Sequence, residues 1–458
     1  MPKIDIHNLI ITPDTAIPAA LEAINKNGVR GIFVCDEGDE LLGIVMDSDI
    51  RRALLAKLDL ESSVKTIMRT SPFVISATVS TEQRPQLLVQ SDKLLVPIVD
   101  TDNRVVDYIY LPDILDQLCT LSSTAEPMDD RILSPQRVLV IGGMGYIGSV
   151  LVSKLVRMGY RVRVLDLLLY GKVELSGVDS GQFEFVRGDC RDEQVVKEVL
   201  KDVDAVVHLI EIVGDPACAI NEAFAIETNY AATQMIIEEC MKSRVKRFVF
   251  ASSCSVYGHN DAIVDEQSAC NPVSLYARCK IESEKAILSN GYDLFCPTIL
   301  RLATVHGQSF RQRFDLVVNL LTIRAVAEGR ITIFGGQQWR PFISVPDICQ
   351  GILTVLRSEA HLVKNQIFNL GDSRENYQLI DIGKALKTEL PDIEMEVQTE
   401  NVDKRNYRVS FEKVKNTLGF TAEYSIADTV YDLVSAYRDK HLYHDHKDAR
   451  YHNYLSLK

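Results

Sequence analysis

Residues 137–148 read RVLVIGGMGYIG, and this stretch decides the fold of the larger part of the chain. Residues 137–141 form a short, mainly apolar run typical of a buried parallel strand, and Gly142, Gly145 and Gly148 follow at once, before a helical pattern. Glycines at such a turn let the backbone approach a pyrophosphate, whose charge is favoured by the N–H groups at the helix start. The stretch therefore predicts the first β-α unit of a dinucleotide-binding fold.

A second predicted strand at 161–165 ends in Asp166, 24 residues after Gly142. A carboxylate at this place can accept both hydroxyls of an adenosine ribose. Because it would repel a 2′-phosphate, the spacing favours NAD over NADP. The alternative is a structural glycine turn followed by a solvated aspartate.

Further strands alternate with helical stretches, which predicts an α/β fold with a doubly wound parallel Rossmann sheet. Ligands of such sheets lie at the carboxyl ends of the strands. The predicted strands cover 183–186, 205–209, 247–252 and 298–302, and the predicted helices include 219–243 and 274–289.

Tyr276 and Lys280 stand four residues apart in one predicted helix, so they share a face. An ammonium beside a phenol, together with a bound nicotinamide cation, favours the phenolate, so Tyr276 can serve as a base near neutral pH. Ser253, at the end of the preceding strand, is placed to hydrogen-bond the same substrate oxygen. An ordinary surface pair on a helix is the alternative.

An internal repeat precedes this fold. Residues 33–50 and 96–114 align at an offset of 64 residues, so that Asp36 matches Asp100 and Asp49 matches Asp113. Each copy predicts a β-β-α unit whose helix is opened by the second aspartate, a residue type that caps helix N-termini. A small, polar and acidic segment then separates the repeat from the dinucleotide fold.

The charge and the cysteines exclude several classes of protein. A net charge of −13 without any Lys/Arg block argues against a nucleic-acid partner. No apolar run reaches the length of a membrane span and no signal-peptide pattern is present, so a cytoplasmic protein without membrane contact is expected. The cysteines form no C-x-x-C pair, which argues against a metal site, and the histidines after residue 440 are expected in a solvated tail.

These motifs together resemble the extended short-chain dehydrogenase/reductase family of NAD-dependent sugar-nucleotide epimerases and dehydratases. The resemblance covers about 137–440 and includes ASSCSVYG at 251–258. It implies NAD as cofactor, a nucleotide sugar as substrate, Ser253, Tyr276 and Lys280 as catalytic residues, and a homodimer or higher homo-oligomer. The cofactor site that it implies consists of Gly142, Gly145, Tyr146, Ile147, Gly148, Asp166, Asp189, Cys190, Leu209, Asn229, Tyr276 and Lys280.

The substrate half resembles the sugar-nucleotide loops of the same family at 311–319 and 339–347. Arg340 matches the arginine that grips the diphosphate, and a guanidinium fork suits two phosphate oxygens. Thr304 and Ser344 depart from the usual residues of galactose-type 4-epimerases, which argues against UDP-glucose itself. The expected substrate-binding residues are Glu211, Ser253, Thr304, Asn319, Arg340 and Arg405.

Glu211 stands where this family usually has a small residue, close to the nicotinamide. A carboxylate at that depth is costly unless it is paired or protonated. Two interpretations stay open: a local salt bridge or an outward-facing loop, and an extra acid or base that acts on the sugar.

The residues after Ser253 indicate the reaction. By the resemblance, 4,6-dehydratases need Asp-Glu there and sugar-acid decarboxylases keep the Glu, whereas this chain has Cys254 and Ser255. The expected reaction is therefore epimerisation through a transient 4-keto intermediate. A nucleotide-sugar ketoreductase or dehydrogenase, or a non-catalytic NAD and adenylate sensor, is the alternative.

The segment GIVMDSDIRRAL at 43–54 resembles the cystathionine-β-synthase (CBS) domain, which pairs in tandem into regulatory modules. The resemblance covers about 8–120 and implies that Asp49 and Asp113 hold the ribose of an AMP- or ATP-type ligand; some such modules serve only as dimer contacts. The expected layout is a tandem CBS module at 1–122, a linker at 123–135, and a Rossmann domain with a C-terminal sugar-nucleotide region at 136–458.

Overall fold

The structure is a computed structural model that describes residues 4–27, 29, 31–46, 49–50, 53, 62–81, 83–84, 87, 95–110, 136–175, 178, 181–289, 295–399, 405–439 and 442–457. The chain separates into two compact units, Met1–Met128 with Ser289–Leu294, and Asp129–Leu288 with Phe295–Lys458. Asp113 and the predicted linker at 123–135 lie outside the described residues. No helix in the described ranges is long and apolar enough to cross a membrane.

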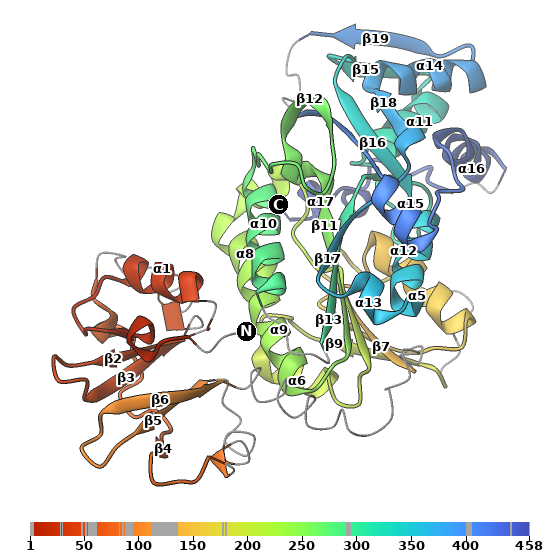
Figure 1. The fold of residues 1–458 in the computed structure, drawn as a ribbon. Coiled ribbons are helices and arrows are strands. Elements are labelled where there is room, and N and C mark those ends of the chain that lie inside the picture. Colours follow the sequence, from red (N-terminus) through yellow and green to blue (C-terminus); the bar gives the residue numbers. More distant parts are fainter. Residues whose placement is uncertain are drawn as a thin grey trace. The chain divides into compact units, whose positions relative to one another are not determined.

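The first unit contains the repeat as two three-stranded sheets with the same strand pairing (Figure 1). In each sheet the first strand runs parallel to the second, and the second runs antiparallel to the third. The sheets are β1 (Ile10–Ile11), β2 (Gly31–Cys35) and β3 (Leu41–Met46), and β4 (Ile75–Ser76), β5 (Leu95–Val99) and β6 (Val105–Tyr110); α1 covers Ile17–Asn27.

The polar turns of the two copies match atom for atom. Asp36 Oδ1 accepts the backbone N–H groups two and four residues later, both at 2.9 Å, and Asp100 Oδ1 does the same at the same distances. The copies also bond to each other, because Leu41 N donates to Asn103 O at 2.9 Å and Val105 N donates to Asp39 O at 3.1 Å. The strands and turns of the predicted repeat are thus present in both copies, while the helix predicted to begin at Asp113 lies outside the described residues.

The second unit is built on one sheet of seven parallel strands in the order β17-β13-β11-β10-β7-β8-β9, which confirms the doubly wound fold. The first strand of the predicted dinucleotide fold, β7, lies inside the sheet between β10 and β8, and its residues 138–141 are buried. The strands are β7 (Arg137–Ile141), β8 (Arg161–Asp166), β9 (Phe183–Arg187), β10 (Ala205–His208), β11 (Arg247–Ser253), β13 (Cys296–Leu302) and β17 (Gln366–Leu370).

Helices cover both faces of this sheet (Figure 1). The prediction of one helix over 219–243 is wrong, because Asn221 adopts an extended conformation there and its Oδ1 accepts the Phe224 N–H as a new helix cap. One face carries α6 (Glu193–Val199), α8 (Glu222–Ile226), α9 (Ala232–Lys242) and α10 (Leu275–Leu288); the other carries α5 (Tyr146–Arg157), α12 (Val345–Arg357) and α13 (Ala360–Val363). A short α7 (Asp215–Ile220) and a π-helical turn (Glu227–Ala231) flank α8.

A smaller region with its own apolar core extends the unit beyond the sheet. Its strands pair as β14 (Thr304–His306), β16 (Trp339–Ser344) and β18 (Asn376–Gln378), as β15 (Arg330–Phe334) with β19 (Glu394–Gln398), and as β12 (His259–Val264) with β20 (Asn406–Val409). Its helices are α11 (Val317–Glu328), α14 (Leu379–Glu389), α15 (Glu412–Leu418), α16 (Ile426–Arg438) and α17 (Asn453–Ser456).

Candidate active site

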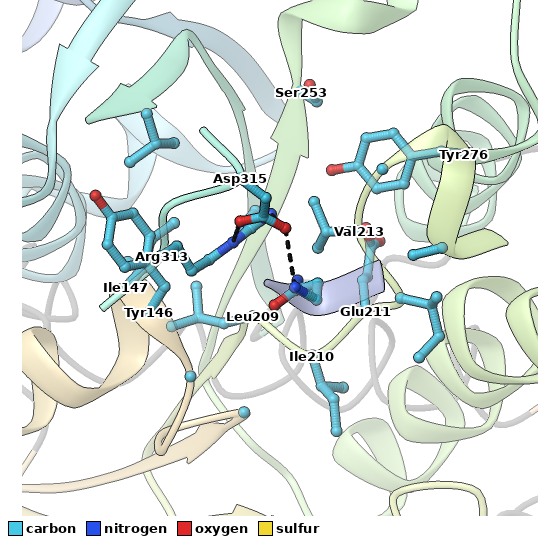
Figure 2. A pocket seen from close by; sticks show the side chains of 18 of the residues that line it. Tyr146, Ile147, Leu209, Ile210, Glu211, Val213, Ser253, Tyr276, Arg313 and Asp315 are labelled. Atoms are coloured by element: carbon cyan, nitrogen blue, oxygen red, sulfur yellow. Dashed lines mark hydrogen bonds and ion pairs between the residues drawn. The ribbon is translucent and has the colours of Figure 1, made fainter. Parts of the chain in front are cut away.

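A cavity of about 560 Å³ lies at the carboxyl ends of the central strands of the second unit. Figure 2 shows Ser253 and Tyr276 on one side of it, with Arg313 and Asp315 between Tyr276 and Tyr146. Its lining includes most of the residues that the sequence predicts for the two ligands: Gly142, Gly145, Tyr146, Ile147, Gly148, Asp166, Asp189, Cys190, Leu209, Glu211, Ser253, Tyr276, Lys280, Thr304, Arg340 and Arg405.

The glycine turn forms one wall of the cavity. Gly142 has a φ of +85°, and a Cβ there would lie 2.9 Å from the backbone N of Ile210. A Cβ on Gly148 would clash with the carbonyl oxygen of Gly142. Helix α5 begins at Tyr146, so its free N–H groups face the same space. This close backbone cradle fits the pyrophosphate of a dinucleotide.

Two carboxylates follow along this wall. Asp166 Oδ2 accepts the Met144 N–H at 2.9 Å and its Oδ1 accepts the Leu168 N–H at 2.8 Å, while burial raises the pKa of the carboxyl. Asp189 is gripped by the guanidinium of Arg191, at 2.6 Å from Nη2, and this hydrogen bonding lowers its pKa. Both side chains are thus held in place at the positions predicted for the adenosine part of NAD.

The catalytic candidates meet where β11 and α10 approach each other. Ser253 ends β11, and its side chain lines the cavity together with that of Tyr276 (Figure 2). Lys280 lies one turn further along α10, with Nζ 4.6 Å from the Phe250 ring centre and 5.6 Å from the Tyr276 ring centre, and it donates to the carbonyl of Ala251. The predicted proximity of the three side chains is therefore present.

A buried ion pair fixes α10 against the sheet. Arg301 on β13 holds Glu284 by two parallel hydrogen bonds, Nε to Oε1 at 3.0 Å and Nη2 to Oε2 at 2.7 Å. Ser252 on β11 donates to the same carboxylate. Since Tyr276, Lys280 and Glu284 recur every four residues, this anchor sets the direction of the catalytic face.

Glu211 turns inward and pairs with Lys280, at 2.7 Å between Oε1 and Nζ. Both side chains are almost completely buried, at 3% and 4% exposure. Burial raises the pKa of Glu211 to about 7, although Lys280 and Tyr276 oppose this shift. The interpretation of Glu211 as a salt-bridge residue is thus realised, and its partner is Lys280, the lysine predicted to be catalytic.

This pair changes the expected electrostatics of Tyr276. The pKa of its phenol is raised well above the ordinary value, first by burial and then by the negative charge of Glu211. Burial also lowers the pKa of Lys280. Among the protein groups, Glu211 offsets the charge of Lys280, so the expected phenolate depends on the added charge of the nicotinamide cation and stays a prediction.

Asn229 shapes the loop that carries Glu211 and does not itself line the cavity among the described residues. It sits in the π-helical turn, where its Oδ1 accepts the Ile212 N–H at 2.8 Å and its Nδ2 donates to the Ile212 carbonyl at 2.9 Å. These two bonds clamp the backbone next to Glu211. The resemblance implies such a shaping function for this asparagine.

The sugar-side predictions divide into two groups. Thr304, Arg340 and Arg405 line the cavity, and Arg340 Nη1 donates to the Trp339 carbonyl at 2.7 Å. Asn319 lies outside the lining that the described residues form, because its amide is fully used to hold the loop before α11. It donates to Tyr146 Oη at 2.8 Å and accepts from Gly307 N at 3.0 Å. The expected substrate contact of Asn319 is thus replaced by a structural one.

Arg311 and Arg313 line the cavity, although the sequence alone does not single them out as ligand-binding residues. Arg311 stacks on the Tyr170 ring at 4.4 Å, and its Nε and Nη2 have no hydrogen-bond partner among the described residues. Arg313 is held by Asp315 at 2.8 Å and 3.0 Å. Their buried N–H groups suit the phosphate oxygens of a ligand. Their basic character is visible in the sequence, but their direction is not.

The segment 442–457 is not the solvated tail that the sequence predicts. It folds back on the second unit, where the Phe314 N–H donates to the Tyr451 carbonyl at 2.9 Å and Leu457 packs against the same small apolar cluster as Tyr276. Asn453 and Tyr454 line the cavity. The sequence holds no local signal for this, because the contacts join residues more than 100 positions apart.

Asp49 belongs to the first unit. It is buried, its Oδ1 accepts from Arg69 Nε at 3.0 Å and its Oδ2 accepts the Met46 N–H at 2.9 Å. The predicted ribose ligand is thus also a local anchor of its repeat.

Comparison with known proteins identifies the family. The model described as "NAD dependent epimerase/dehydratase family" matches residues 138–371, just over half of the chain, and the CBS domain model matches residues 4–56. UDP-glucose 4-epimerase of Lactobacillus helveticus is 29% identical over 271 residues, which cover 55% of this chain and 81% of that protein. dTDP-glucose 4,6-dehydratase of Streptomyces niveus is 28% identical over 320 residues, which cover 66% and 93%.

A solved structure of UDP-glucose 4-epimerase from Thermotoga maritima with UDP-glucose is 27% identical. It has a TM-score of 0.60 and covers 66% of this chain and 99% of its own. Most of the residues that line the cavity lie within the matched region, and those that follow it are Leu379, Arg405, Tyr407, Asn453 and Tyr454. The chain therefore belongs to the NAD-dependent epimerase/dehydratase family and carries a CBS domain before its Rossmann unit.

Proposed function

We propose that the protein is a nucleotide-sugar epimerase that inverts one carbon of the sugar through a transient 4-keto intermediate. The observation that carries the proposal is the convergence of Ser253, Tyr276 and Lys280 in one cavity with the glycine cradle. NAD, which the glycine turn and Asp166 would hold, would supply reversible hydride transfer at C4 of the sugar and a positive charge beside the phenol.

The protein groups move the proton that accompanies this hydride. Tyr276, as the phenolate, takes the proton of the 4-hydroxyl and later gives it back, so the enzyme returns to its starting state. Ser253 hydrogen-bonds the same oxygen and holds it beside the phenol. Lys280 places its ammonium next to both, with Glu211 balancing its charge.

The two residues after Ser253 favour epimerisation over loss of water. Cys254 is buried, its Sγ donates to the Arg301 carbonyl at 3.2 Å, and burial raises its pKa far above neutrality. Ser255 lines the cavity with a hydroxyl but brings no carboxyl group. An Asp-Glu pair that could move a proton and expel water is therefore missing from these positions.

Glu211 supports a second candidate, a 4,6-dehydratase. Its pKa of about 7 suits a general acid, and its carboxyl group lies beside Tyr276. A 4-epimerase and a 4,6-dehydratase have similar sequence identity to this chain, so the reaction products must distinguish the two activities.

The test starts from the purified full-length protein. Acid release of bound dinucleotide identifies the cofactor, and UDP-, GDP-, CDP- and dTDP-sugars are then screened by NMR and mass spectrometry. An epimerase yields an isomer of unchanged mass, a dehydratase yields a product lighter by one water, and a ketoreductase consumes NADH.

Tyr276→Phe is expected to lower turnover by about 10²- to 10⁴-fold while the bound NAD is retained. Ser268→Ala, in an exposed turn, serves as control. Turnover of Tyr276→Phe equal to that of the parent, or no reaction with any of the sugar nucleotides, would overturn the proposal.

Adenine-nucleotide regulation through the first unit is proposed separately. Asp49 is the residue that connects the predicted ribose site with the fold of its repeat. AMP or ATP is expected to raise the melting temperature or to change turnover, and Asp49→Asn to weaken that response. If the first unit is purely structural, AMP and ATP will change neither the melting temperature nor turnover. Deletion of residues 1–125 will then leave turnover unchanged as well.

A further inference from the structure

The segment 442–457 forms part of the active-site cavity, although it follows the matched family region by some 70 residues. Three contacts hold it. Tyr443 and Tyr451 pack on the Phe314 ring, both with ring centres 5.2 Å from it. Lys447 pairs with Glu328 at 3.0 Å. The segment thus closes onto the sugar side of the cavity.

Asn453 is the polar residue that this segment brings to the cavity. Its backbone N–H donates to Asp315 Oδ2 at 3.0 Å, and Asp315 in turn holds Arg313 (Figure 2). The residue is 3% exposed and lines the cavity. Its side-chain Oδ1 has no hydrogen-bond partner among the described residues. A buried amide oxygen without a partner is costly, and a bound donor removes that cost.

The chemistry of this oxygen limits what it can bind. A carbonyl oxygen accepts hydrogen bonds and repels phosphate oxygens, so the diphosphate is excluded as its partner. A sugar ring offers hydroxyl donors. Leu457, at the C-terminal end of the short helix α17, packs against the same apolar cluster as Tyr276, the proposed catalytic base.

We propose that Asn453 is a substrate-contacting residue whose Oδ1 accepts a hydrogen bond from a hydroxyl of the sugar. The inference rests on the proposed function, since it requires a nucleotide sugar in this cavity. The network Asn453–Asp315–Arg313 ties recognition of the sugar to the position of an arginine beside the catalytic residues.

The test measures binding to the NAD-loaded, full-length protein with Tyr276→Phe, which prevents turnover. UDP and UDP-glucose, and in parallel the dTDP, GDP and CDP pairs, are titrated by calorimetry into this parent and into Asn453→Ala. We expect the sugar nucleotide to bind about tenfold more weakly to Asn453→Ala, while the free nucleotide binds as before. Leu455→Ala is the matched control, because Leu455 lies on the same short helix and is 43% exposed.

The outcomes separate this inference from the proposed function. Equal affinity of Asn453→Ala and its parent for the sugar nucleotide overturns the contact but leaves the function standing. Equal losses for the free nucleotide and the sugar nucleotide place Asn453 outside the sugar subsite and also overturn it. Failure of the parent to bind any nucleotide sugar overturns the proposed function, and the contact falls with it. Melting temperatures of all variants confirm that they are folded.

Discussion

The two walls of the cavity are built in different ways. The wall predicted for NAD comes from the glycine turn 142–148 and the ends of β8 and β9, and much of what it presents is backbone. The opposite wall, predicted for the sugar nucleotide, is assembled from side chains such as Arg313, Arg340 and Asn453, which are up to 140 residues apart. Backbone geometry is hard to vary, whereas side chains are easily exchanged. The first wall is therefore suited to one constant ligand and the second to a ligand that differs between relatives.

The largest expected effect comes from breaking the backbone wall. Gly148→Ala places a Cβ against the Gly142 carbonyl, so the turn must open and the pyrophosphate cradle is lost. We expect the purified variant to contain no NAD on acid release and to show no turnover. Gly159→Ala is the control: its φ of +87° adds strain, but its Cβ meets no atom within 4 Å. Normal NAD content in Gly148→Ala would contradict the assigned wall.

Glu211→Gln tests the function of Glu211, which lines the cavity where the two walls adjoin. The change keeps the shape but leaves Lys280 without its 2.7 Å partner, and we expect kcat to fall roughly tenfold to hundredfold. Because the carboxyl has a pKa of about 7, the parent is expected to lose activity as the pH falls through 7 and the ion pair is protonated. The variant lacks this step. Measured between pH 5.5 and 9, identical profiles for both proteins would exclude the role, and Glu222→Gln on exposed α8 is the control.

A substitution in the wall predicted for the sugar nucleotide is expected to weaken binding of the sugar nucleotide without changing the amount of bound NAD. Asp315→Asn removes the charge that holds Arg313 at 2.8 Å and 3.0 Å but keeps an acceptor for the Asn453 N–H. We expect KM for the sugar nucleotide to rise about tenfold with NAD content unchanged. Asp381→Asn, which affects an exposed pair with Lys384, provides the baseline. Loss of NAD from Asp315→Asn would show that the walls are not independent.

The smallest expected effect is on the pH dependence of stability. It concerns two buried histidines, one in the seven-stranded sheet and one in the smaller region. Burial lowers the pKa of His208, at the end of β10, to about 3 and that of His306, in β14, to about 4. Below about pH 6.5 the unfolded chain therefore takes up protons that the folded protein refuses. Each histidine then removes about 1.4 kcal/mol of unfolding free energy per pH unit, until its own folded pKa is reached.

Denaturant unfolding between pH 7 and 4.5 measures this slope. His208→Gln and His306→Gln are each expected to flatten it by the same amount, because over this pH range both rings stay neutral in the folded protein and take up a proton on unfolding. The exposed His259→Gln is expected to leave it unchanged. If neither buried substitution changes the dependence of the unfolding free energy on pH, other groups cause the loss of stability in acid.

The sequence was most informative where neighbours in the chain are neighbours in space. The glycine turn, Asp166 and the Tyr276–Lys280 pair follow from local spacing, and the two-copy turn at Asp36 and Asp100 follows from the repeat. Glu211 stands out only through the family resemblance, and its pairing with Lys280 joins the loop after β10 to α10 and depends on packing. The fold-back of Asn453 and the inward amide of Asn319 depend on still longer contacts, for which hydrophobic patterns carry no signal.

The anchored helix α10 has a consequence for insertions and deletions. Glu284 is fixed to β11 and β13 by Ser252 and Arg301. The proposed catalytic side chains of Lys280 and Tyr276 lie four and eight residues before it. Since each residue of an α-helix advances the direction of its side chain by about 100°, one residue added between Lys280 and Glu284 would turn Tyr276 out of the cavity. Such a chain would keep every catalytic residue and still be inactive. The number of residues between anchor and phenol is therefore as much a part of this active site as the chemical groups themselves.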